Sequence, residues 1–419
     1  MTHKQFNLIL FTGSYPFDCV FETTFISPEI PYLNNFFNVT IIPKCLSSKC
    51  ESVPVHIENG FGEMLHLNQM VYYKIQMLIL CFTTFIFYKE LFVKFNKILH
   101  IQSFIYLIRF LGTAVQTRNW ILNYIKDNNI NLNYTIFYTY WLDEITMGLV
   151  LAKISHPNMK IVSRAHGGDL YEERHYCSYI PMRPEIFSSI DKIFTDSKKG
   201  EQYFVSKYPK FESVFSVSLM GISEQTLLSK FSTDKIFRIA TCSYLTAVKR
   251  IELLIWGLEK LGKIRKDQIF EWTHIGDGIL QSELERIART HLPQNVKYKF
   301  IGYLPKDEVI FFYQNNPVDV FINVSSSEGT PVSIMEAQSV GITVIATSVG
   351  GNSEIVTNES GLLLSANPDV DEIANAISFL LDNHTLLLDK RRESYENWCK
   401  YYNSDINFQC FVDDLLKLF

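Results

Sequence analysis

The chain has 419 residues, of which 47% are hydrophobic and 20% are charged, and its formal net charge is −5 at pH 7. A chain of this length exceeds what one hydrophobic core usually organises, so we expect a globular protein of two domains, each of roughly 200 residues. The negative net charge argues against a general nucleic-acid binder, whose surface is normally basic.

The cysteine pattern and the N-terminus favour a cytoplasmic protein. The eight cysteines are scattered and include no CxxC pair, and the nearest two, Cys45 and Cys50, lack partners at metal-ligand spacing. We therefore expect reduced thiols. The N-terminal stretch MTHKQFNLILFTGSYPF has an apolar run too short for a signal-peptide core and no small-residue cleavage site.

The first half of the chain alternates short apolar runs with longer helical stretches, which predicts a parallel sheet covered by helices. The predicted strands are FNLILFTG (6–13), NVTIIP (38–43), YTIFYTY (134–140), KIVSRAH (160–166) and KIFTDS (192–197). The predicted helices include Phe104–Lys126 and Glu144–Ile154.

One stretch between these elements raises the question of a membrane. The apolar run IQMLILCFTTFIFY (75–88) is shorter than the roughly 20 residues that a spanning helix needs. The residues after it mix aromatic and aliphatic side chains with Lys and Arg. Two interpretations stay open: buried helices with solvated lysines, or a surface that docks on a membrane carrying a lipid-linked partner.

The alternation begins again after a polar stretch between Ser223 and Asp234, where we place the domain boundary. The second half predicts strands at 236–245, 270–278, 296–304 and 318–327, and helices at 250–264, 281–292 and 307–316. Two open α/β domains leave a crevice at the carboxyl ends of their strands, where ligands bind.

The stretch SSSEGTPVSIMEAQ (325–338) follows the last of these strands and carries a helix start. Thr330 is suited to the N-cap and Pro331 to the first helical position, and we expect the helix to run to about Val340, with Gly341 ending it. The free backbone N–H groups and the positive end of the helix dipole together form an anion site.

Two carboxylates flank this helix start. Glu328 lies just before it, and Glu336 lies about 8 Å along the helix at a rise of 1.5 Å per residue. A carboxylate accepts two hydrogen bonds from a diol, so a nucleotide-sugar with its diphosphate at the helix start fits between them. The simpler alternative is an exposed helix residue and a loop charge. A retaining glycosidase pair would need carboxylates about 5 Å apart, which disfavours that function.

The stretch SSSEGTPVSIMEAQSVGITVIATSVGGNSEIV (325–356) resembles the glutamate-x7-glutamate signature of retaining glycosyltransferases, specifically glycosyltransferase family 4 with its GT-B fold. The resemblance covers nearly the whole chain. Other stretches that follow in the family's order are 10–33, FYTYWLDE (137–144), SRAHGGDLYEER (163–174), CSYLTAVKRIELLIWGLEKL (242–261), HIGDG (274–278) and FIGYL (300–304).

The resemblance implies an α/β fold of two Rossmann-like domains that face each other across a cleft, with a C-terminal helix returning to the first domain. We expect an N-terminal acceptor-side domain at 1–225, a C-terminal nucleotide-sugar-binding domain at 226–395, and a C-terminal helix at 396–419 that packs back on the N-terminal domain. The amphipathic end NFQCFVDDLLKLF (407–419) suits that helix.

The resemblance also assigns roles to the residues around the signature. Glu328 matches the glutamate that faces the donor sugar, and Glu336 matches the one that binds the ribose. The backbone of Gly329, Thr330 and Pro331 matches the turn that meets the sugar and the diphosphate.

Four further residues are candidates on the same grounds. Lys249 matches a lysine that offsets the diphosphate charge, and Arg250 after it is a second cation. His166 matches an N-domain histidine that reaches the donor sugar, and Gly13 lies in the loop that approaches the diphosphate. The alternatives are a solvated lysine before a helix and a capping or packed histidine.

Two positions depart from the family's pattern. Family members commonly carry an arginine five positions before the lysine, where this chain has Tyr244. The loop after the first strand often has a glycine pair, where this chain has only Gly13. Both changes concern the donor diphosphate.

The implied activity is sugar transfer, with retention, from a UDP- or GDP-linked donor to a saccharide or lipid-linked acceptor, as in bacterial surface polysaccharide biosynthesis. We expect no metal, no separate cofactor and no nucleic-acid partner. We expect a cytoplasmic location, and a peripheral contact with the inner face of the membrane stays open. The motif DVD (369–371) opens a helical pattern and is not expected to bind metal. Two other functions stay open: a catalytically weak scaffold subunit of another transferase, and a nucleotide-sugar epimerase.

Overall fold

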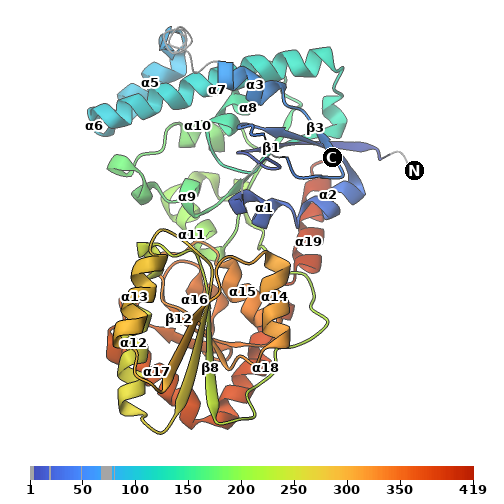
Figure 1. Cartoon of the computed structure of the whole chain (residues 1–419). Helices are drawn as coiled ribbons and strands as arrows, with labels where there is room; N and C mark the ends of the chain where they lie inside the picture. Colours follow the sequence, from blue (N-terminus) through green and yellow to red (C-terminus); the bar gives the residue numbers. More distant parts are fainter. Residues whose placement is uncertain (1–3, 18–19, 49, 68–77, 80) are drawn as a thin grey trace. The chain divides into compact units, whose positions relative to one another are not determined.

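The computed structural model describes residues 4–17, 20–48, 50–67, 78–79 and 81–419 (Figure 1). The chain divides into two compact units, each described here by itself. Unit 1 comprises Met1–Ser218 and Phe408–Phe419, and unit 2 comprises Leu219–Asn407. The first boundary therefore lies seven residues before the predicted end of the first domain at 225.

Unit 1 is built on a sheet of seven parallel strands in the order β3-β2-β1-β4-β5-β6-β7. The strands are β1 (Phe6–Thr12), β2 (Phe37–Pro43), β3 (His56–Ile57), β4 (Thr135–Thr139), β5 (Lys160–Ala165), β6 (Lys192–Thr195) and β7 (Phe215–Val217). The five predicted strands are confirmed. Central parallel strands are buried on both faces, which is why their sequences are continuous apolar runs.

Helices surround this sheet. They are α1 (Val20–Ile26), α2 (Ile30–Phe36), α3 (Gly60–Leu67), α5 (Phe85–Val93), α6 (Phe95–Ile98), α7 (Ile101–Asp127), α8 (Glu144–Lys153), α9 (Gly167–Leu170), α10 (Arg183–Phe187) and α11 (Lys198–Lys207). Short 3₁₀ turns lie at Leu132–Tyr134, Glu172–Arg174, Tyr176–Ser178 and Pro209–Val214. Helices α7 and α8 confirm the two predicted helices, and they approach closely at Gly148, where a Cβ would lie 2.4 Å from the Cβ of Thr117.

The apolar run at 75–88 lies partly outside the described residues, and its described end begins α5. No helix in the described ranges is both long enough and apolar enough to cross a bilayer. The seven cysteines in the described part of the chain are free thiols.

The C-terminal segment Phe408–Phe419 belongs to unit 1, although the chain leaves that unit at Ser218. It forms most of α19 (Ser404–Leu416), whose Phe411, Val412 and Leu415 are buried in the core beneath β1 and β4. The returning helix is shorter than the predicted segment 396–419, because residues up to Tyr401 form the end of α18 (His384–Tyr401) in unit 2.

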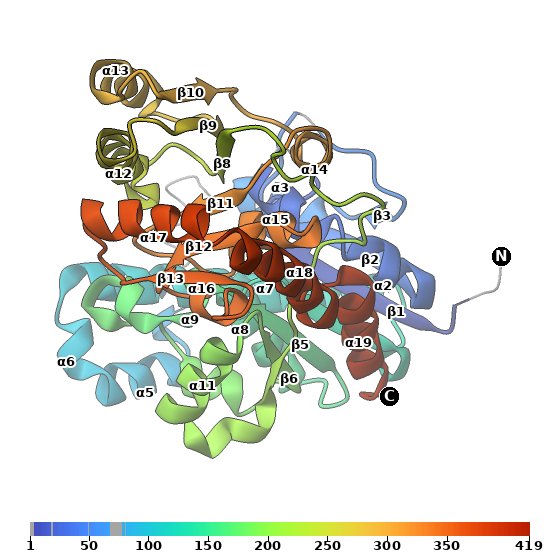
Figure 2. The same ribbon diagram turned by 90° about the horizontal axis from the view of Figure 1, so that it is seen from below.

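Unit 2 contains six parallel strands in the order β10-β9-β8-β11-β12-β13. The strands are β8 (Ile236–Cys242), β9 (Ile269–Ile275), β10 (Val296–Phe300), β11 (Val320–Asn323), β12 (Thr343–Thr347) and β13 (Gly361–Leu364). The remaining helices are α12 (Ile251–Ile264), α13 (Gln281–His291), α14 (Lys306–Asn315), α15 (Val332–Ser339), α16 (Asn352–Ile355) and α17 (Val370–Asp382). Figure 2 shows α12, α13 and α17 on one face of this sheet and α14, α15 and α18 on the other. The strands and helices predicted for this half are confirmed.

The strand order of unit 2 reverses between β8 and β11. From β8 the chain runs outward through β9 to β10, and then returns to place β11 on the other side of β8. In open parallel sheets a ligand crevice forms at such a reversal, outside the carboxyl ends of the strands. The segments that follow β8 and β11 are those that carry Lys249 and Glu328.

Candidate active site

Glu328 is a buried carboxylate held by three donors at the reversal of the unit 2 sheet. It is 9% exposed, and its Oε1 accepts hydrogen bonds from Lys249 Nζ at 2.7 Å, Ser325 Oγ at 2.6 Å and Asn323 Nδ2 at 3.1 Å. Lys249 and Glu328 are 79 residues apart in sequence, so the fold brings them together. Lys249 is therefore an ion-paired side chain of this site and not a solvated lysine.

Asn323 and Ser325 were not anticipated from the sequence. Asn323 ends β11, and its Oδ1 also accepts the backbone N–H of Ser325 at 3.0 Å. Both side chains are buried. A signal existed, because polar residues directly after a buried parallel strand lie at the edge of the sheet where ligands bind. Their hydrogen bonds fix the direction in which the Glu328 carboxylate points.

The backbone after Glu328 is held by a glycine pair, Gly350 and Gly351. The N–H of Gly351 donates to the carbonyl oxygen of Gly329 at 2.9 Å, and a Cβ on Gly351 would lie 2.3 Å from that oxygen. Gly350 has φ +49°, and a Cβ there would lie 2.0 Å from the carbonyl oxygen of Glu328. Only glycine permits these approaches. The pair lies within the signature stretch but was not singled out from the sequence.

The helix start differs by one residue from the prediction. Helix α15 begins at Val332, and its N-cap is Pro331, with φ −75° and ψ 105°, so Thr330 is not the cap. Proline can supply the cap because its φ suits both extended and helical backbone, and its carbonyl accepts the N–H of Ile334 at 3.2 Å. At the other end, Gly341 has φ +73°, as expected for the residue that ends the helix.

Glu336 is buried on α15 and only 5% exposed, so it is not an ordinary surface residue. Burial raises its pKa to about 7, and the charge of Lys306 at the start of α14 opposes that rise. The same burial lowers the pKa of Lys306. Lys306 was not predicted as part of the site. A carboxylate this strongly desolvated gains most from a partner that donates hydrogen bonds to it.

Arg250 has a positioning role. Its backbone is left-handed, with φ +50°, and its guanidinium donates to the carbonyl oxygens of Val324 at 2.7 Å, Ser325 at 2.8 Å and Ala366 at 3.0 Å. These bonds fix the turn between β11 and Glu328. A contact between Arg250 and a diphosphate stays a prediction. Tyr244, at the position of the family's arginine, is 61% exposed.

In unit 1, His166 follows β5 as the N-cap of α9. The ring is 9% exposed and lies with its centroid 4.8 Å from that of Tyr140 and 4.8 Å from that of Trp141. Neither ring nitrogen has a hydrogen-bond partner among the described residues. Burial, together with the nearby charge of Arg164, lowers the pKa of His166 to about 3, so the imidazole is neutral at physiological pH.

The loop around His166 is fixed by Asp169. One carboxylate oxygen of Asp169 accepts the backbone N–H of His166 at 2.5 Å, and the other accepts that of Leu142 at 2.7 Å. Burial raises the pKa of Asp169 to about 7. The side chain of His166 therefore keeps its direction without help from its own nitrogens, which leaves them available to a ligand.

Gly13 lies in a loop after β1 that already binds an anion of the protein. The carboxylate of Glu22 accepts the backbone N–H groups of Gly13 at 2.8 Å, Ser14 at 2.6 Å and Tyr15 at 2.7 Å. Trp141 Nε1 donates to the same carboxylate. A role for the Gly13 amide toward a diphosphate stays a prediction, because Glu22 accepts its N–H here.

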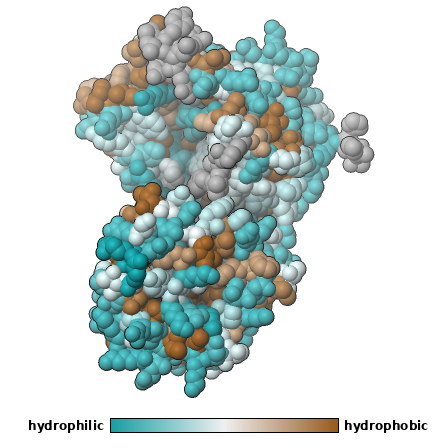
Figure 3. All heavy atoms as spheres, in the orientation of Figure 1, coloured by the Kyte–Doolittle hydropathy of each residue, from teal (hydrophilic) through white to brown (hydrophobic). Residues whose placement is uncertain are grey.

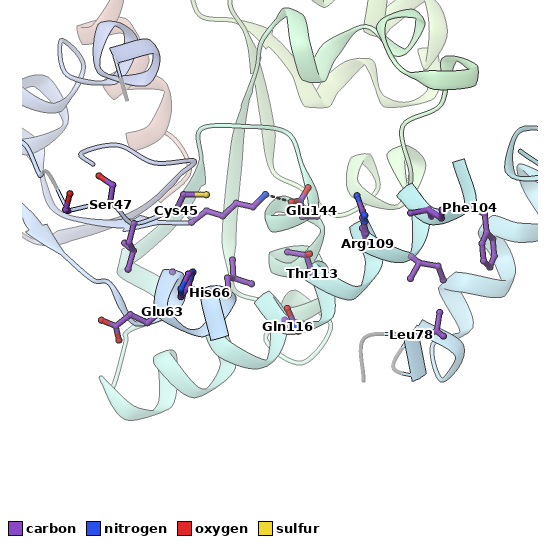
Figure 4. A pocket seen from close by; sticks show the side chains of 17 residues that line it. Cys45, Ser47, Glu63, His66, Leu78, Phe104, Arg109, Thr113, Gln116 and Glu144 are labelled. Atoms are coloured by element: carbon purple, nitrogen blue, oxygen red, sulfur yellow. Dashed lines mark hydrogen bonds and ion pairs between the residues drawn. The ribbon is translucent and has the colours of Figure 1, made fainter. Parts of the chain in front are cut away.

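Unit 1 also contains a cavity of about 1010 Å³ between α3, α7 and the segment after β2 (Figure 4). Its polar lining includes Lys44, Glu63, His66, Arg109, Gln116 and Glu144, and its apolar lining includes Leu46, Leu65, Leu78, Phe104, Ile105 and Ile108. Lys44 and Glu144 form an ion pair inside it. The cavity thus offers both polar and apolar walls.

The described part of the chain contains no group of three or more His, Cys, Asp or Glu side chains placed to hold a metal ion. Asp369 of the DVD motif is the N-cap of α17, and its side chain accepts the N–H of Glu372 at 2.8 Å. The prediction of a helix start at this motif is confirmed.

Part of the second half of the chain matches a known family of sequences. Residues 230–401 match the family described as "Glycosyl transferases group 1". An α-1,3-galactosyltransferase of Escherichia coli that acts on α-D-GlcNAc-diphosphoundecaprenol is 31% identical over 113 residues, which are 27% of this chain and 28% of that protein. The amylovoran biosynthesis glycosyltransferase AmsK of Erwinia amylovora is 25% identical over 228 residues, 51% of this chain and 53% of that protein. The chain thus spans about half or less of the length of these curated relatives.

Solved structures resemble the chain over almost its whole length. The lipopolysaccharide outer core galactosyltransferase WaaB has a TM-score of 0.70 at 14% identity, over 99% of this chain and 100% of that one. Anabaena Alr3699/HepE in complex with UDP and glucose has a TM-score of 0.63 at 14% identity, over 98% and 100%. The chain therefore has the two-domain, Rossmann-like GT-B fold, and its relatives by sequence are glycosyltransferases.

Proposed function

We propose that the chain is a retaining glycosyltransferase that moves a sugar from a UDP- or GDP-linked donor to a hydroxyl group of a saccharide or lipid-linked acceptor. The observation that carries the proposal is the pair of buried carboxylates, Glu328 and Glu336, on either side of the start of α15, with Lys249 Nζ 2.7 Å from Glu328. Two structural relatives support a nucleotide-sugar, since the structure of HepE contains UDP and glucose and that of the pneumococcal GtfA contains UDP and GlcNAc.

In this proposal each part of the donor meets a group suited to it. The ribose hydroxyls donate to Glu336, which as a buried carboxylate lacks water to solvate it. The diphosphate binds the free N–H groups at the start of α15 and the ammonium group of Lys249. The sugar hydroxyls donate to Glu328, whose direction Ser325 and Asn323 hold.

Sugar transfer requires positive charge near the bond between the sugar carbon and the leaving diphosphate. Negative charge builds on the departing diphosphate as the sugar carbon becomes oxocarbenium-like, and fixed donors in a site of low dielectric stabilise that charge. Lys249 and the helix start supply it from the protein, so we propose that no metal is needed. Glu328 orients the sugar, and the leaving phosphate takes the proton of the acceptor hydroxyl on the same face, which retains the anomeric configuration.

We place the acceptor in unit 1, in the cavity beside α3 and α7, and the contact to the donor sugar on His166. A mixed polar and apolar lining suits a saccharide carried on a lipid. The E. coli relative's name specifies a diphosphoundecaprenol substrate, and AmsK is named for amylovoran biosynthesis. A cytoplasmic role in bacterial surface polysaccharide biosynthesis follows from this proposal.

The test is product analysis with a set of UDP- and GDP-sugars, with and without a saccharide or undecaprenyl-linked acceptor. We expect nuclear magnetic resonance to show a glycoside with the anomeric configuration of the donor. Glu328→Gln should lower turnover on the order of 100-fold by removing a charged group aimed at the sugar, whereas Glu308→Gln, on the exposed side of α14, should not. An inverted product, or a Glu328→Gln variant with full turnover, would refute the proposal. Conversion of the donor without an acceptor would favour an epimerase.

A further inference from the structure

One end of unit 1 exposes large hydrophobic side chains on three consecutive helices. We call this surface the α5–α7 face, defined by Phe85, Phe92, Phe95, Leu99 and Ile101, which are 81%, 88%, 59%, 66% and 68% exposed. Figure 3 shows hydrophobic side chains gathered at the end of unit 1 where α6 lies. Single exposed hydrophobic residues are common on proteins, but a contiguous group of this kind marks an interaction site.

The arrangement of α5 explains why this face is not part of the core. The opposite side of α5 carries Phe87 and Glu90, which are buried, and the Phe87 ring packs 6.4 Å from that of Phe104 on α7. Phe85, Tyr88 and Phe92 recur at the spacing of one helix side and remain exposed. Helix α5 is therefore apolar on both sides, and only one side is used for packing within the protein.

The charges around the face are basic. Between residues 81 and 126 the sequence contains one carboxylate, Glu90, which is buried and accepts the hydroxyl of Tyr179 at 2.9 Å. Lys94 and Arg109 form no ion pair with any described residue. Two further lysines pair with carboxylates from other elements: Lys89 with Glu185, and Lys97 with Glu172.

We propose that the α5–α7 face docks on an anionic lipid bilayer, with its aromatic and aliphatic side chains in the boundary between headgroups and acyl chains. Basic groups beside exposed Phe and Leu, with no exposed carboxylate between residues 81 and 126, are the combination that interfacial helices use. A second copy of the chain is a poorer occupant, because a two-fold interface would set the basic side chains of one face against those of its partner.

The face is also continuous with the cavity of unit 1. Ile105, one helical turn after Ile101, is 43% exposed and lines that cavity together with Phe104 and Ile108. If the proposed function holds, a lipid-linked acceptor reaches the cavity while its lipid stays in the bilayer. The docking itself does not depend on sugar transfer, so it is tested without donor or acceptor.

The experiment is co-sedimentation of the full chain with vesicles of phosphatidylcholine, alone or with phosphatidylglycerol added. We expect binding to the anionic vesicles that weakens as salt is raised. The double variant Phe92→Ser/Phe95→Ser should lower the partition coefficient by about tenfold or more, because it removes two aromatic side chains from the apolar layer. The matched control is Ile279→Ser/Phe311→Ser, which removes two side chains of unit 2 that are 87% and 65% exposed; it should bind like the wild type.

Two further measurements keep the proposal falsifiable. The melting temperature of each variant verifies that it folds. The tryptophan fluorescence emission of the Phe92→Trp variant, compared with that of the wild type, should shift to shorter wavelength with anionic vesicles and not with neutral ones. Absence of wild-type binding, or equal binding by both double variants, would overturn the proposal. So would a dimer in size-exclusion chromatography that Phe92→Ser/Phe95→Ser dissociates while vesicle binding is absent, since the face would then join two copies of the chain.

Discussion

Gly351→Ala adds one methyl group behind the loop that carries Glu328. A Cβ at this position would lie 2.3 Å from the carbonyl oxygen of Gly329, and the same oxygen accepts the Gly351 N–H at 2.9 Å. The neighbour is backbone, so no side chain can rotate away. The backbone segments that contain Gly329 and Gly351 must therefore separate, and the loop from Glu328 to Thr330 must move.

The size of the effect follows from that distance. Real Cβ atoms essentially never come closer than 3.0 Å to such an atom, so the loop must shift by at least about 0.7 Å. A displacement near 1 Å at a reacting centre costs about 100-fold in rate, which is the loss of turnover we expect. Overpacking of this kind also costs about 1–3 kcal/mol of unfolding free energy, or several degrees in melting temperature for a unit of this size.

The matched control is Gly361→Ala on β13. A Cβ there would lie 2.2 Å from the carbonyl oxygen of Val344, which is also a backbone atom. This close contact lies between the paired strands β12 and β13, whereas that of Gly351 lies at the loop that carries Glu328. We expect a similar loss of melting temperature from both variants. Turnover per folded molecule, and the dissociation constant of the nucleoside diphosphate measured by titration calorimetry, should deteriorate only for Gly351→Ala.

One outcome would refute this reasoning. If Gly351→Ala loses as much stability as Gly361→Ala yet keeps wild-type turnover and nucleotide affinity, then the contact between Gly351 and Gly329 does not position the site. The glycine pair would then serve only the packing of unit 2.

Three other substitutions test separate parts of the site. The folded protein raises the pKa of Glu336 to about 7 and so holds the proton more tightly than the unfolded chain, which makes the free energy of unfolding of the wild type fall by about 3 kcal/mol between pH 4.5 and 7. Glu336→Gln should abolish this fall. Denaturant unfolding at a series of pH values measures the free energy, and a fall that persists in the variant would contradict the prediction. His166→Phe keeps the ring contacts but not the free nitrogens, so we expect an unchanged melting temperature and turnover lower by on the order of 100-fold, whereas full turnover would remove His166 from the site. Tyr244→Arg places a cation five residues before Lys249 and should tighten nucleoside diphosphate binding by about tenfold. The control Tyr401→Arg makes the same change at another exposed tyrosine of unit 2 and should leave that affinity unchanged. Unchanged affinity in Tyr244→Arg would show that the absence of an arginine at position 244 does not weaken diphosphate binding.

The fold was largely predictable because its strands are parallel and central. Such strands are buried on both faces, and their continuous apolar runs stand out from the amphipathic helices between them. Strands β3, β7, β12 and β13 were not predicted. Of these, β3 and β7 have only two and three residues, and segments that short carry no periodic pattern. The end of the second unit was placed too early, because α18 and α19 are separated only by a short turn near Asn403.

The site was predictable only in part. Glu328 and Glu336 were singled out from the helix start between them, whereas Lys249 was identified only through the family resemblance, since residues 79 positions apart give no local sign of an ion pair. The direction of Arg250 depends on its left-handed backbone, which nothing in the neighbouring sequence indicates. The N-cap at Pro331 depends on a ψ of 105°, set by the loop that the glycine pair holds. Tertiary contacts decide all three features.

The most direct measurement of the central claim is a thermal-shift series with UDP, GDP, CMP and ADP on the wild type, Lys249→Ala and Lys260→Ala, the last on the exposed side of α12. A nucleotide at 100 times its dissociation constant adds about 2.7 kcal/mol of stability, which is several degrees in melting temperature. We predict such a shift with UDP or GDP for the wild type and Lys260→Ala, and its loss in Lys249→Ala. No shift with any nucleotide, or a shift unaffected by Lys249→Ala, would contradict a diphosphate site between Glu328 and Glu336.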